Sequence, residues 1–148
     1  MPHLWVERGG LRLSTLDLVS GFTLLTGAAG AGWTRAARDA ADRLGVPLAV
    51  CRIAPGAPST ADPIAGGTPV TDTTGPAFAP GASHVFDAFD AFHRDGRWPG
   101  LAGIAADGAL LVRPDQIVAW RAPALPAGPA GDPAADLARA LAHVLARS

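Results

Sequence analysis

The sequence predicts an α/β fold in which helices cover both faces of a mixed sheet. Three observations lead to this prediction. Apolar segments typical of buried strands alternate with amphipathic segments typical of helices. One amphipathic segment separates the first two core strands, so these strands should run parallel. The last two strands are separated by a turn that is too short for anything but an antiparallel hairpin.

The first predicted element is a β-hairpin near the N-terminus. Residues 4–6 form a short apolar run, and residues 11–13 alternate between apolar and charged side chains. The connecting residues 7–10 contain Gly9 and Gly10, which is typical of a tight turn. We expect this hairpin to be an extra element in front of the core strands.

A strand, a helix and a second strand follow. Residues 22–26 form an apolar strand, which ends at a glycine-rich turn over residues 27–32. Apolar side chains then recur at the spacing of one helix face, at Trp33, Ala36, Ala37, Ala40 and Leu44. Gly45 and Pro47 end this helix, and residues 47–53 form the second strand. The sequence therefore predicts one right-handed βαβ unit.

Residues 84–93 are predicted to form a second helix. Phe86, Phe89 and Phe92 supply a packing face, and Ser83 is the expected N-cap. The same segment carries His84 and His93 around two aspartates, a pattern that suggests metal ligands. Nine residues of helix advance about 900°, which places the two histidines on opposite sides. A shared metal ion is therefore not expected.

The C-terminal part is predicted to contain a hairpin and a helix. Residues 109–112 and 117–120 are strands joined by the turn 113–116. Asp132 is the expected N-cap of the last helix and Pro133 its first residue. An apolar stripe should face the sheet, formed by Leu137, Leu141, Val144 and Leu145. Residues 122–131 are a linker, and the proline- and glycine-rich residues 55–83 are a long loop or mobile arm, for which disorder and docking on a partner are equally open.

This order of elements is that of the thioredoxin fold, with an extra N-terminal hairpin. The sheet should contain about four core strands, built from a βαβ unit and a ββα unit. Another α/β sandwich is the alternative. A length of 148 residues with 49% hydrophobic content fits one domain over residues 1–148.

Composition excludes several classes of function. Twelve basic residues against thirteen acidic ones leave no basic patch for nucleic acid. The single cysteine, Cys51, excludes an internal disulfide and a Cys-x-x-Cys redox pair. Lysine and tyrosine are absent, which removes Schiff-base lysines and tyrosine acids. There is no signal-peptide pattern and no apolar run of ~18 residues, so a cytoplasmic protein with no membrane contact is expected.

Three features that suggest chemistry have simpler structural interpretations. The glycine-rich turn after residue 26 lacks the Gly-x-Gly-x-x-Gly spacing of dinucleotide sites, and Arg52 stands where an acidic ribose ligand belongs, so a tight structural turn is favoured. Cys51 lies in a predicted strand, where a thiol is most often a small buried hydrophobe. The tryptophans that suggest aromatic stacking are more simply core or interface anchors, namely Trp33, Trp98 and Trp120.

Three stretches together resemble the C-terminal domain of FAD-dependent aromatic hydroxylases, in particular those that act on actinomycete aromatic polyketides. The first is Pro-His-Leu-Trp-Val at residues 2–6, and the second runs from Ser-Thr-Leu-Asp-Leu at residues 14–18 into residues 21–27. The third and most specific is Gly-Ala-Leu-Leu-Val-Arg-Pro-Asp at residues 108–115, followed by Val-Ala-Trp-Arg at residues 118–121. The stretches occur in the family's order, and only the proline-rich middle is unmatched.

The resemblance implies an enzyme that uses FAD, NAD(P)H and O₂ to hydroxylate a polycyclic aromatic substrate through a flavin hydroperoxide. The family's flavin and substrate sites lie in domains that precede the Pro-His stretch. No catalytic, cofactor or metal residue is therefore expected in this chain. The implied role is a redox-inactive thioredoxin-like module, because residues 28–33 and 106–108 lack the sulfur and the proline of a thioredoxin site. It would pack against the flavin and substrate domains or self-associate; the alternative is a free-standing binding or accessory module in aromatic polyketide biosynthesis.

The residues that carry the resemblance are assigned structural roles. Pro114 presets the turn, Asp115 can bond backbone two residues on, and Arg113 and Arg121 can pair with Asp115 or with a neighbouring domain. Gln116 replaces a glycine common in the family. The N-terminal hairpin and Asp17 are expected on the docking side, with an apolar patch that involves Leu4 or Trp5. The complete set is Pro2, His3, Asp17, Arg113, Pro114, Asp115, Trp120 and Arg121.

Overall fold

Two parallel strands joined by a helix lie at the centre of the sheet. In the computed structural model, which describes residues 1–56, 86–127 and 131–146, these are β3 (Phe22–Thr26), α1 (Ala31–Leu44) and β4 (Leu48–Pro55). Phe22 pairs with Leu48 and the register continues to Thr26 and Arg52. Gly45 ends α1 in the left-handed conformation, with a φ of 63°. A residue with a side chain would be strained in this conformation. The predicted βαβ unit is confirmed.

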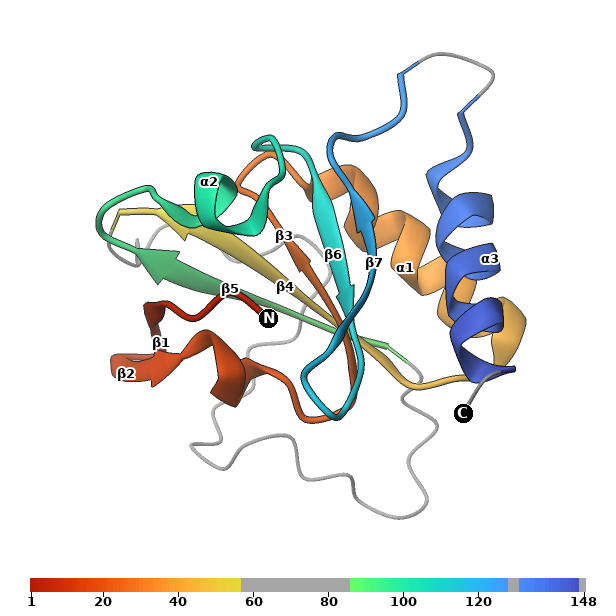
Figure 1. Cartoon of the computed structure of the whole chain (residues 1–148), viewed down its shortest axis with the longest axis horizontal. Coiled ribbons are helices and arrows are strands. Elements are labelled where there is room, and N and C mark those ends of the chain that lie inside the picture. Colours follow the sequence, from red (N-terminus) through yellow and green to blue (C-terminus); the bar gives the residue numbers. More distant parts are fainter. Residues whose placement is uncertain (57–85, 128–130, 147–148) are drawn as a thin grey trace.

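The described strands form one mixed sheet of seven, in the order β2-β1-β5-β4-β3-β6-β7 (Figure 1). The N-terminal hairpin consists of β1 (Trp5–Arg8) and β2 (Leu11–Ser14), and a short 3-10 helix, η1 (Thr15–Leu18), follows it. The other predicted hairpin consists of β6 (Ala109–Val112) and β7 (Val118–Ala122), with β6 antiparallel to β3. Both hairpins are confirmed.

The predicted helix over residues 84–93 is wrong. Residues Phe86–His93 form strand β5, which pairs in parallel with β4 over eight residue pairs. Phenylalanines three residues apart suit a helix face, but β4 otherwise has an open edge whose backbone groups need partners. Glu7 also pairs with Phe92, so β5 joins the N-terminal hairpin to the core strands. The sheet therefore has one strand more than the four core strands and the two-stranded hairpin that we expected.

This correction also removes the argument against a shared metal ion, because that argument relied on helix geometry. Ser83 and His84 lie outside the described residues. Within the described ranges, no group of three or more His, Cys, Asp or Glu side chains is placed to hold a metal ion.

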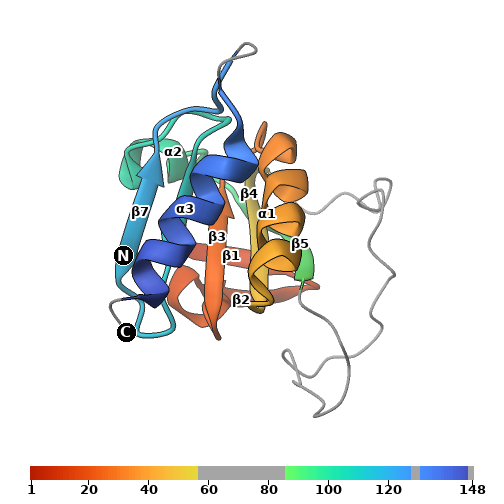
Figure 2. The same cartoon turned by 90° about the vertical axis from the view of Figure 1, so that its right-hand side faces the viewer.

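Each face of the sheet carries its own core. Helix α1 and helix α3 (Pro133–Leu145) lie side by side on one face (Figure 2). They pack on alternate strand residues of the sheet, namely Leu24, Leu48, Val50 and Leu111. The opposite face is covered by the N-terminal segment, η1 and the short helix α2 (Trp98–Ala102). Helices therefore lie on both faces as expected, but α2, on the second face, replaces the helix predicted over residues 84–93.

Helix α3 begins as the sequence predicts. The side chain of Asp132 accepts a hydrogen bond of 3.0 Å from the backbone N–H of Ala134, and Pro133 is the first helical residue. Leu137 and Leu141 are fully buried against the sheet. The predicted linker begins later than expected, because Ala122 still belongs to β7.

Most of the proline-rich arm predicted over residues 55–83 lies outside the described residues. Pro55 itself is the last residue of β4. In the part of the chain that the structure describes, no helix has the combination of length and apolar character that crossing a bilayer requires.

Candidate functional site

Thr15 fixes the N-terminal segment to η1. Its hydroxyl accepts a hydrogen bond from the N–H of Leu4 at 3.1 Å and donates one to the carbonyl of Pro2 at 2.9 Å. The N–H of Thr15 also donates to the carbonyl of Leu4 at 2.8 Å. Thr15 is fully buried, so these bonds are shielded from water. The sequence offered no signal for this contact, because the partners are eleven and thirteen residues away.

Replacing this hydroxyl should loosen the N-terminal segment. Thr15→Val keeps the side-chain shape but leaves the N–H of Leu4 without its acceptor, so we expect a loss of about 2 kcal/mol in the free energy of unfolding. Amide hydrogen exchange at Leu4 should accelerate. Thr23→Val is a matched control, because Thr23 is equally buried but its hydroxyl makes one bond, to Gly21. Equal losses in both variants, with unchanged exchange at Leu4, would contradict this role.

Asp17 completes the cap of η1. Its carboxylate accepts a hydrogen bond of 2.8 Å from the N–H of Ser14, while the Ser14 side chain accepts one of 3.1 Å from the N–H of Leu16. This reciprocal pair is a capping box, which holds the turn between β2 and η1. Asp17 is exposed.

The expected apolar patch is smaller than predicted. Leu4 is only 6% exposed and belongs to the core, whereas Trp5 is 52% exposed. The Trp5 ring meets the His3 ring edge-on at 5.5 Å, and the Arg12 guanidinium lies 5.0 Å from its centroid. Leu11 is equally exposed, but its register opposite Arg8 places it on the other face of the hairpin.

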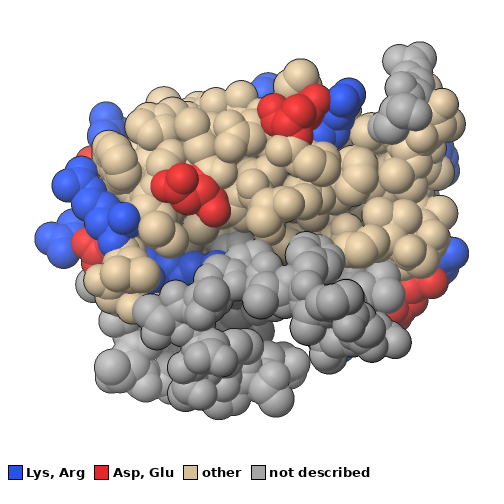
Figure 3. Space-filling view, turned by 90° about the horizontal axis from the view of Figure 1, so that it is seen from below, with Lys and Arg blue, Asp and Glu red and all other residues tan. Residues whose placement is uncertain are grey.

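The face seen from below in Figure 1 carries little charge. Basic side chains gather at the end where the β1–β2 hairpin lies, and most of the described surface beyond it is uncharged (Figure 3). Few charges are also typical of the core of a docking interface. Trp5, at 52% exposed, is the aromatic side chain that the hairpin itself offers as an anchor.

The Arg-Pro-Asp turn makes the local contacts that the sequence predicts. Asp115 accepts a hydrogen bond of 3.3 Å from the N–H of Ile117, and Arg113 forms an ion pair of 2.7 Å with Asp115. Gln116 reaches η1, because its amide donates to the carbonyl of Leu16 at 3.3 Å. The structure thus places this turn and the segment around Pro2 against the short helix that contains Asp17.

Gln116 has a backbone conformation that suits glycine. Its φ of 65° makes it the one non-glycine residue with positive φ among the described residues. Gln116→Gly should have a free energy of unfolding about 0.5–1 kcal/mol above that of Gln116→Ala, because both lose the amide bond to Leu16 and only glycine relieves the left-handed strain. Thermal unfolding measures this change. Gln116→Ala loses the bond to Leu16 but keeps the strain, and a glycine variant no more stable than it would contradict the prediction.

Trp120 and Arg121 lie at the other end of the β6–β7 hairpin. The Trp120 ring meets the buried Trp33 ring edge-on at 5.6 Å, on the face covered by α1 and α3. Arg121 points toward α2, where a Cβ added to Gly103 would lie 3.0 Å from its guanidinium. Arg113, and not Arg121, is therefore the partner that the structure gives to Asp115.

The glycine-rich turn after β3 is explained by close packing. The N–H of Gly27 donates to Gly108 at 3.2 Å, and that of Ala29 donates to Ala106 at 2.9 Å. A Cβ on Gly27 would lie 2.7 Å from the carbonyl carbon of Ala106, and a Cβ on Gly30 would overlap the Thr26 side chain. These contacts favour the structural interpretation of the turn.

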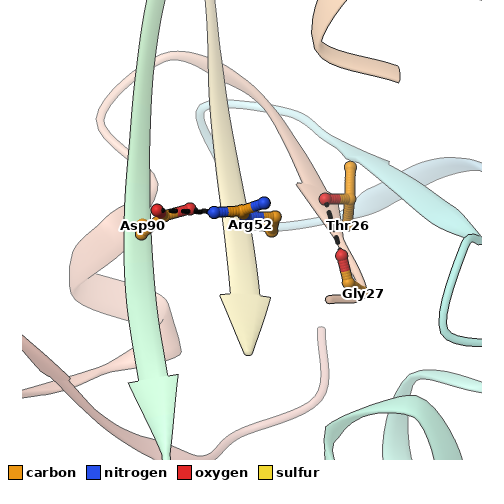
Figure 4. Close-up of polar contacts among 4 residues, drawn as sticks. All are labelled: Thr26, Gly27, Arg52 and Asp90. Atoms are coloured by element: carbon orange, nitrogen blue, oxygen red, sulfur yellow. Dashed lines mark hydrogen bonds and ion pairs between the residues drawn. The ribbon is translucent and has the colours of Figure 1, made fainter. Parts of the chain in front are cut away.

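Arg52 is engaged by a carboxylate on the neighbouring strand. Its guanidinium makes two hydrogen bonds to Asp90, of 2.8 and 2.9 Å, and both side chains lie in line with Thr26 across β3, β4 and β5 (Figure 4). Asp90 is largely buried, which strengthens the pair. Sequence reasoning missed this contact because it placed Asp90 on a helix, and the strand register is the signal that reveals it.

Cys51 is a buried core residue. Its side chain is fully buried between strands, and burial raises the pKa of its thiol far above the ordinary value. A thiol with so little thiolate is a poor nucleophile. The interpretation of Cys51 as a small hydrophobe agrees with this geometry.

Comparison with known families matches the whole chain. The family described as aromatic-ring hydroxylase, C-terminal, matches residues 1–148. The chain belongs to this family. Tetracenomycin A2 monooxygenase-dioxygenase from Streptomyces glaucescens is 36% identical over 149 residues, which cover 100% of this chain and 20% of that protein. 2,4-Dichlorophenol 6-monooxygenase from Delftia acidovorans is 36% identical over 82% of the chain and 16% of its own length.

Solved structures of this aromatic-ring hydroxylase family share the fold. Aklavinone-11 hydroxylase, in a ternary complex with FAD and aklavinone, superposes with a TM-score of 0.66 at 34% identity, over 98% of this chain and 20% of the hydroxylase. The monooxygenase PieE, in complex with FAD and substrate, gives a TM-score of 0.64 over 19% of its length. The present chain thus spans about a fifth of the relatives that it matches.

Proposed function

We propose that this chain is a non-catalytic, thioredoxin-like module of an FAD-dependent aromatic hydroxylase and that it packs against the flavin and substrate domains. The observation that carries this proposal is the convergence of the family stretches on η1. Thr15 holds the segment at Pro2, Asp17 caps the helix, and Gln116 bonds Leu16. Pro2 and Gln116, which are far apart in the sequence, are thereby both bonded to η1, which directly follows the hairpin that carries the exposed Trp5.

The strand arrangement supports the thioredoxin-like part of the proposal. Strands β4, β3, β6 and β7 are neighbours in that order, the first two parallel and the last two antiparallel, with α1 and α3 on one face. A redox site of this fold would precede α1, where Gly27 and Ala29 are bonded to the 106–108 loop. The only thiol, Cys51, is buried in β4, so the module is redox-inactive.

The chemistry of the enzyme belongs to its other domains. Two of the solved relatives are complexes with FAD, one with aklavinone and one with its substrate. We infer FAD, NAD(P)H and O₂ as the reagents and a polycyclic aromatic polyketide as the substrate of the enzyme that contains this module. The role of the module is to hold those domains in their assembled form.

A domain exchange tests this function. We would replace the matching fifth of tetracenomycin A2 monooxygenase-dioxygenase with this chain and measure FAD retention and hydroxylation by the chimera. Both should persist, whereas the same enzyme with the fifth deleted should lose them. The isolated chain should show no visible flavin absorbance after purification. A yellow isolated chain, or a deletion enzyme as active as the chimera, would refute the proposal.

The docking surface has a matched pair of variants. In the chimera, Trp5→Ala should weaken domain packing, which is read as faster FAD loss, because an exposed aromatic side chain is a typical interface anchor. Leu11→Ala changes an equally exposed residue on the other face of the same hairpin and should have little effect. Equal effects would contradict docking through the Trp5 face, and sedimentation of the isolated chain would then test self-association.

A further inference from the structure

The turn that joins β5 to α2 is built around His93. His93 is the last residue of β5 and is 5% exposed. Its Nδ1 accepts a hydrogen bond of 3.2 Å from the backbone N–H of Asp95. Its carbonyl accepts one of 3.0 Å from the N–H of Gly56, which directly follows β4. His93 therefore ties this turn to the ends of two strands.

The bond to Asp95 requires a neutral imidazole ring. A ring nitrogen accepts a hydrogen bond only while it carries no proton, so the single proton of the ring is on Nε2. Nε2 is buried and has no hydrogen-bond partner among the described residues. A second proton would therefore break the bond to the Asp95 N–H and would place a charge on a ring that has one N–H without an acceptor.

Most of the surroundings of His93 are apolar. The small cavity that it borders is otherwise lined by glycine and apolar residues, among them Ile53 and Pro55 of β4 and Trp98 of α2. None of the five residues of α2 is charged. These elements offer no compensation for a positive ring, and burying a charge without compensation is costly.

The charged groups near the ring do not reverse this cost. Burial is the largest influence and lowers the pKa of His93; the Asp95 carboxylate raises it, and the Arg97 guanidinium lowers it again. Asp95 and Arg97 form an exposed ion pair of 3.1 Å with each other. Arg8 of β1 lies on the same face of the sheet as His93 and adds a further positive charge to that face. The neutral ring is therefore favoured in the closed turn.

We propose that the turn between β5 and α2 is a pH-sensitive switch, which the neutral ring of His93 holds closed and which opens when the ring gains a proton. The closed turn is fully stable above the ordinary pKa of histidine, about 6.5, and loses stability as the pH falls through that value, because the freed ring binds a proton that the closed turn excludes. Opening releases α2 and its buried Trp98 from the face of the sheet that they cover. This switch belongs to the folded chain itself and does not depend on the docking proposed above.

NMR of the ¹⁵N-labelled chain tests the switch. Long-range ¹H–¹⁵N spectra should show His93 as the Nε2–H tautomer at neutral pH. Amide exchange of Asp95, corrected for its intrinsic rate, gives the opening constant of the turn. This constant should rise by up to about tenfold per pH unit between about pH 7 and pH 5.5, because each opening takes up one proton. His93→Asn retains an acceptor oxygen for the Asp95 N–H but does not titrate, so its opening constant should stay constant over this range.

A second histidine provides the control. His143→Asn removes a histidine that is exposed on α3, so the rise at Asp95 should persist in this variant. The proposal is overturned if His93 is the Nδ1–H tautomer, if His93 titrates while the Asp95 opening constant stays the same, or if His93→Asn shows the same rise on acidification. The tautomer and the titration are measured on the unmodified chain, so they decide the proposal even where the variant does not fold.

Discussion

Gly27→Ala should destabilise the fold by about 3 kcal/mol, because the new methyl group would overlap the backbone of Ala106. The Cβ would lie 2.7 Å from the carbonyl carbon of Ala106 and 3.0 Å from its Cα, with the carbonyl oxygen closer still. Unlike the end of a flexible side chain, this backbone cannot move alone. The N–H of Ala29 is bonded to the same Ala106 carbonyl, and Gly27 itself is bonded to Gly108.

Urea unfolding with an open-space control measures this effect. Gly21→Ala adds the same methyl group where nothing beyond the neighbouring residues lies within 4 Å. We expect its free energy of unfolding to change by less than about 0.5 kcal/mol. An unchanged m-value in both variants would show that stability, and not the compactness of either state, has changed. If Gly27→Ala were as stable as Gly21→Ala, packing would not explain the glycine at this turn, and the site would need another interpretation.

The parts of the fold that were predicted correctly are those encoded by local pattern. Helix α1 follows from apolar residues at helical spacing and from the stop at Gly45, and α3 follows from the Asp132 cap. The Arg-Pro-Asp turn was predicted for the same reason, because Arg113 and Asp115 are near neighbours in the chain. These features depend on contacts within a few residues, which sequence patterns record directly.

The parts that were missed depend on partners that are far away in the sequence. Strand β5 was predicted as a helix because its three-residue phenylalanine spacing is local, whereas its pairing with β4 is not. The pair of Arg52 and Asp90 spans 38 residues. Two buried nitrogens, His93 Nε2 and Trp98 Nε1, have no hydrogen-bond partner among the described residues, which only the folded positions of β5 and α2 reveal. The exposed patch was expected to involve Leu4 or Trp5, and Leu4 is instead buried in the core beside Leu18 and Val6.

Trp33→Ala should cost about 4 kcal/mol, within the range measured for removing a large aromatic side chain from a core. Trp33 is fully buried among α1, α3 and the sheet. The edge-on contact with Trp120 adds roughly 0.5–1.5 kcal/mol beyond the burial of area. The indole N–H donates to the carbonyl of Asp107 at 2.7 Å, so the same side chain also ties α1 to the loop before β6.

A second tryptophan in this chain separates the effect of burial from the effect of residue type. Trp5→Ala removes the same side chain from a site that is 52% exposed, so its unfolding free energy should change by less than about 1 kcal/mol. Trp33→Phe retains most of the volume but loses the bond to Asp107, and it should fall between the two. Since a fold of this kind is stable by about 5–15 kcal/mol, Trp33→Ala removes a large share of the total. A Trp33→Ala loss no larger than that of Trp5→Ala would mean that the α1 face is not the main core, and that the opposite face, around Leu25 and Trp98, holds the fold together.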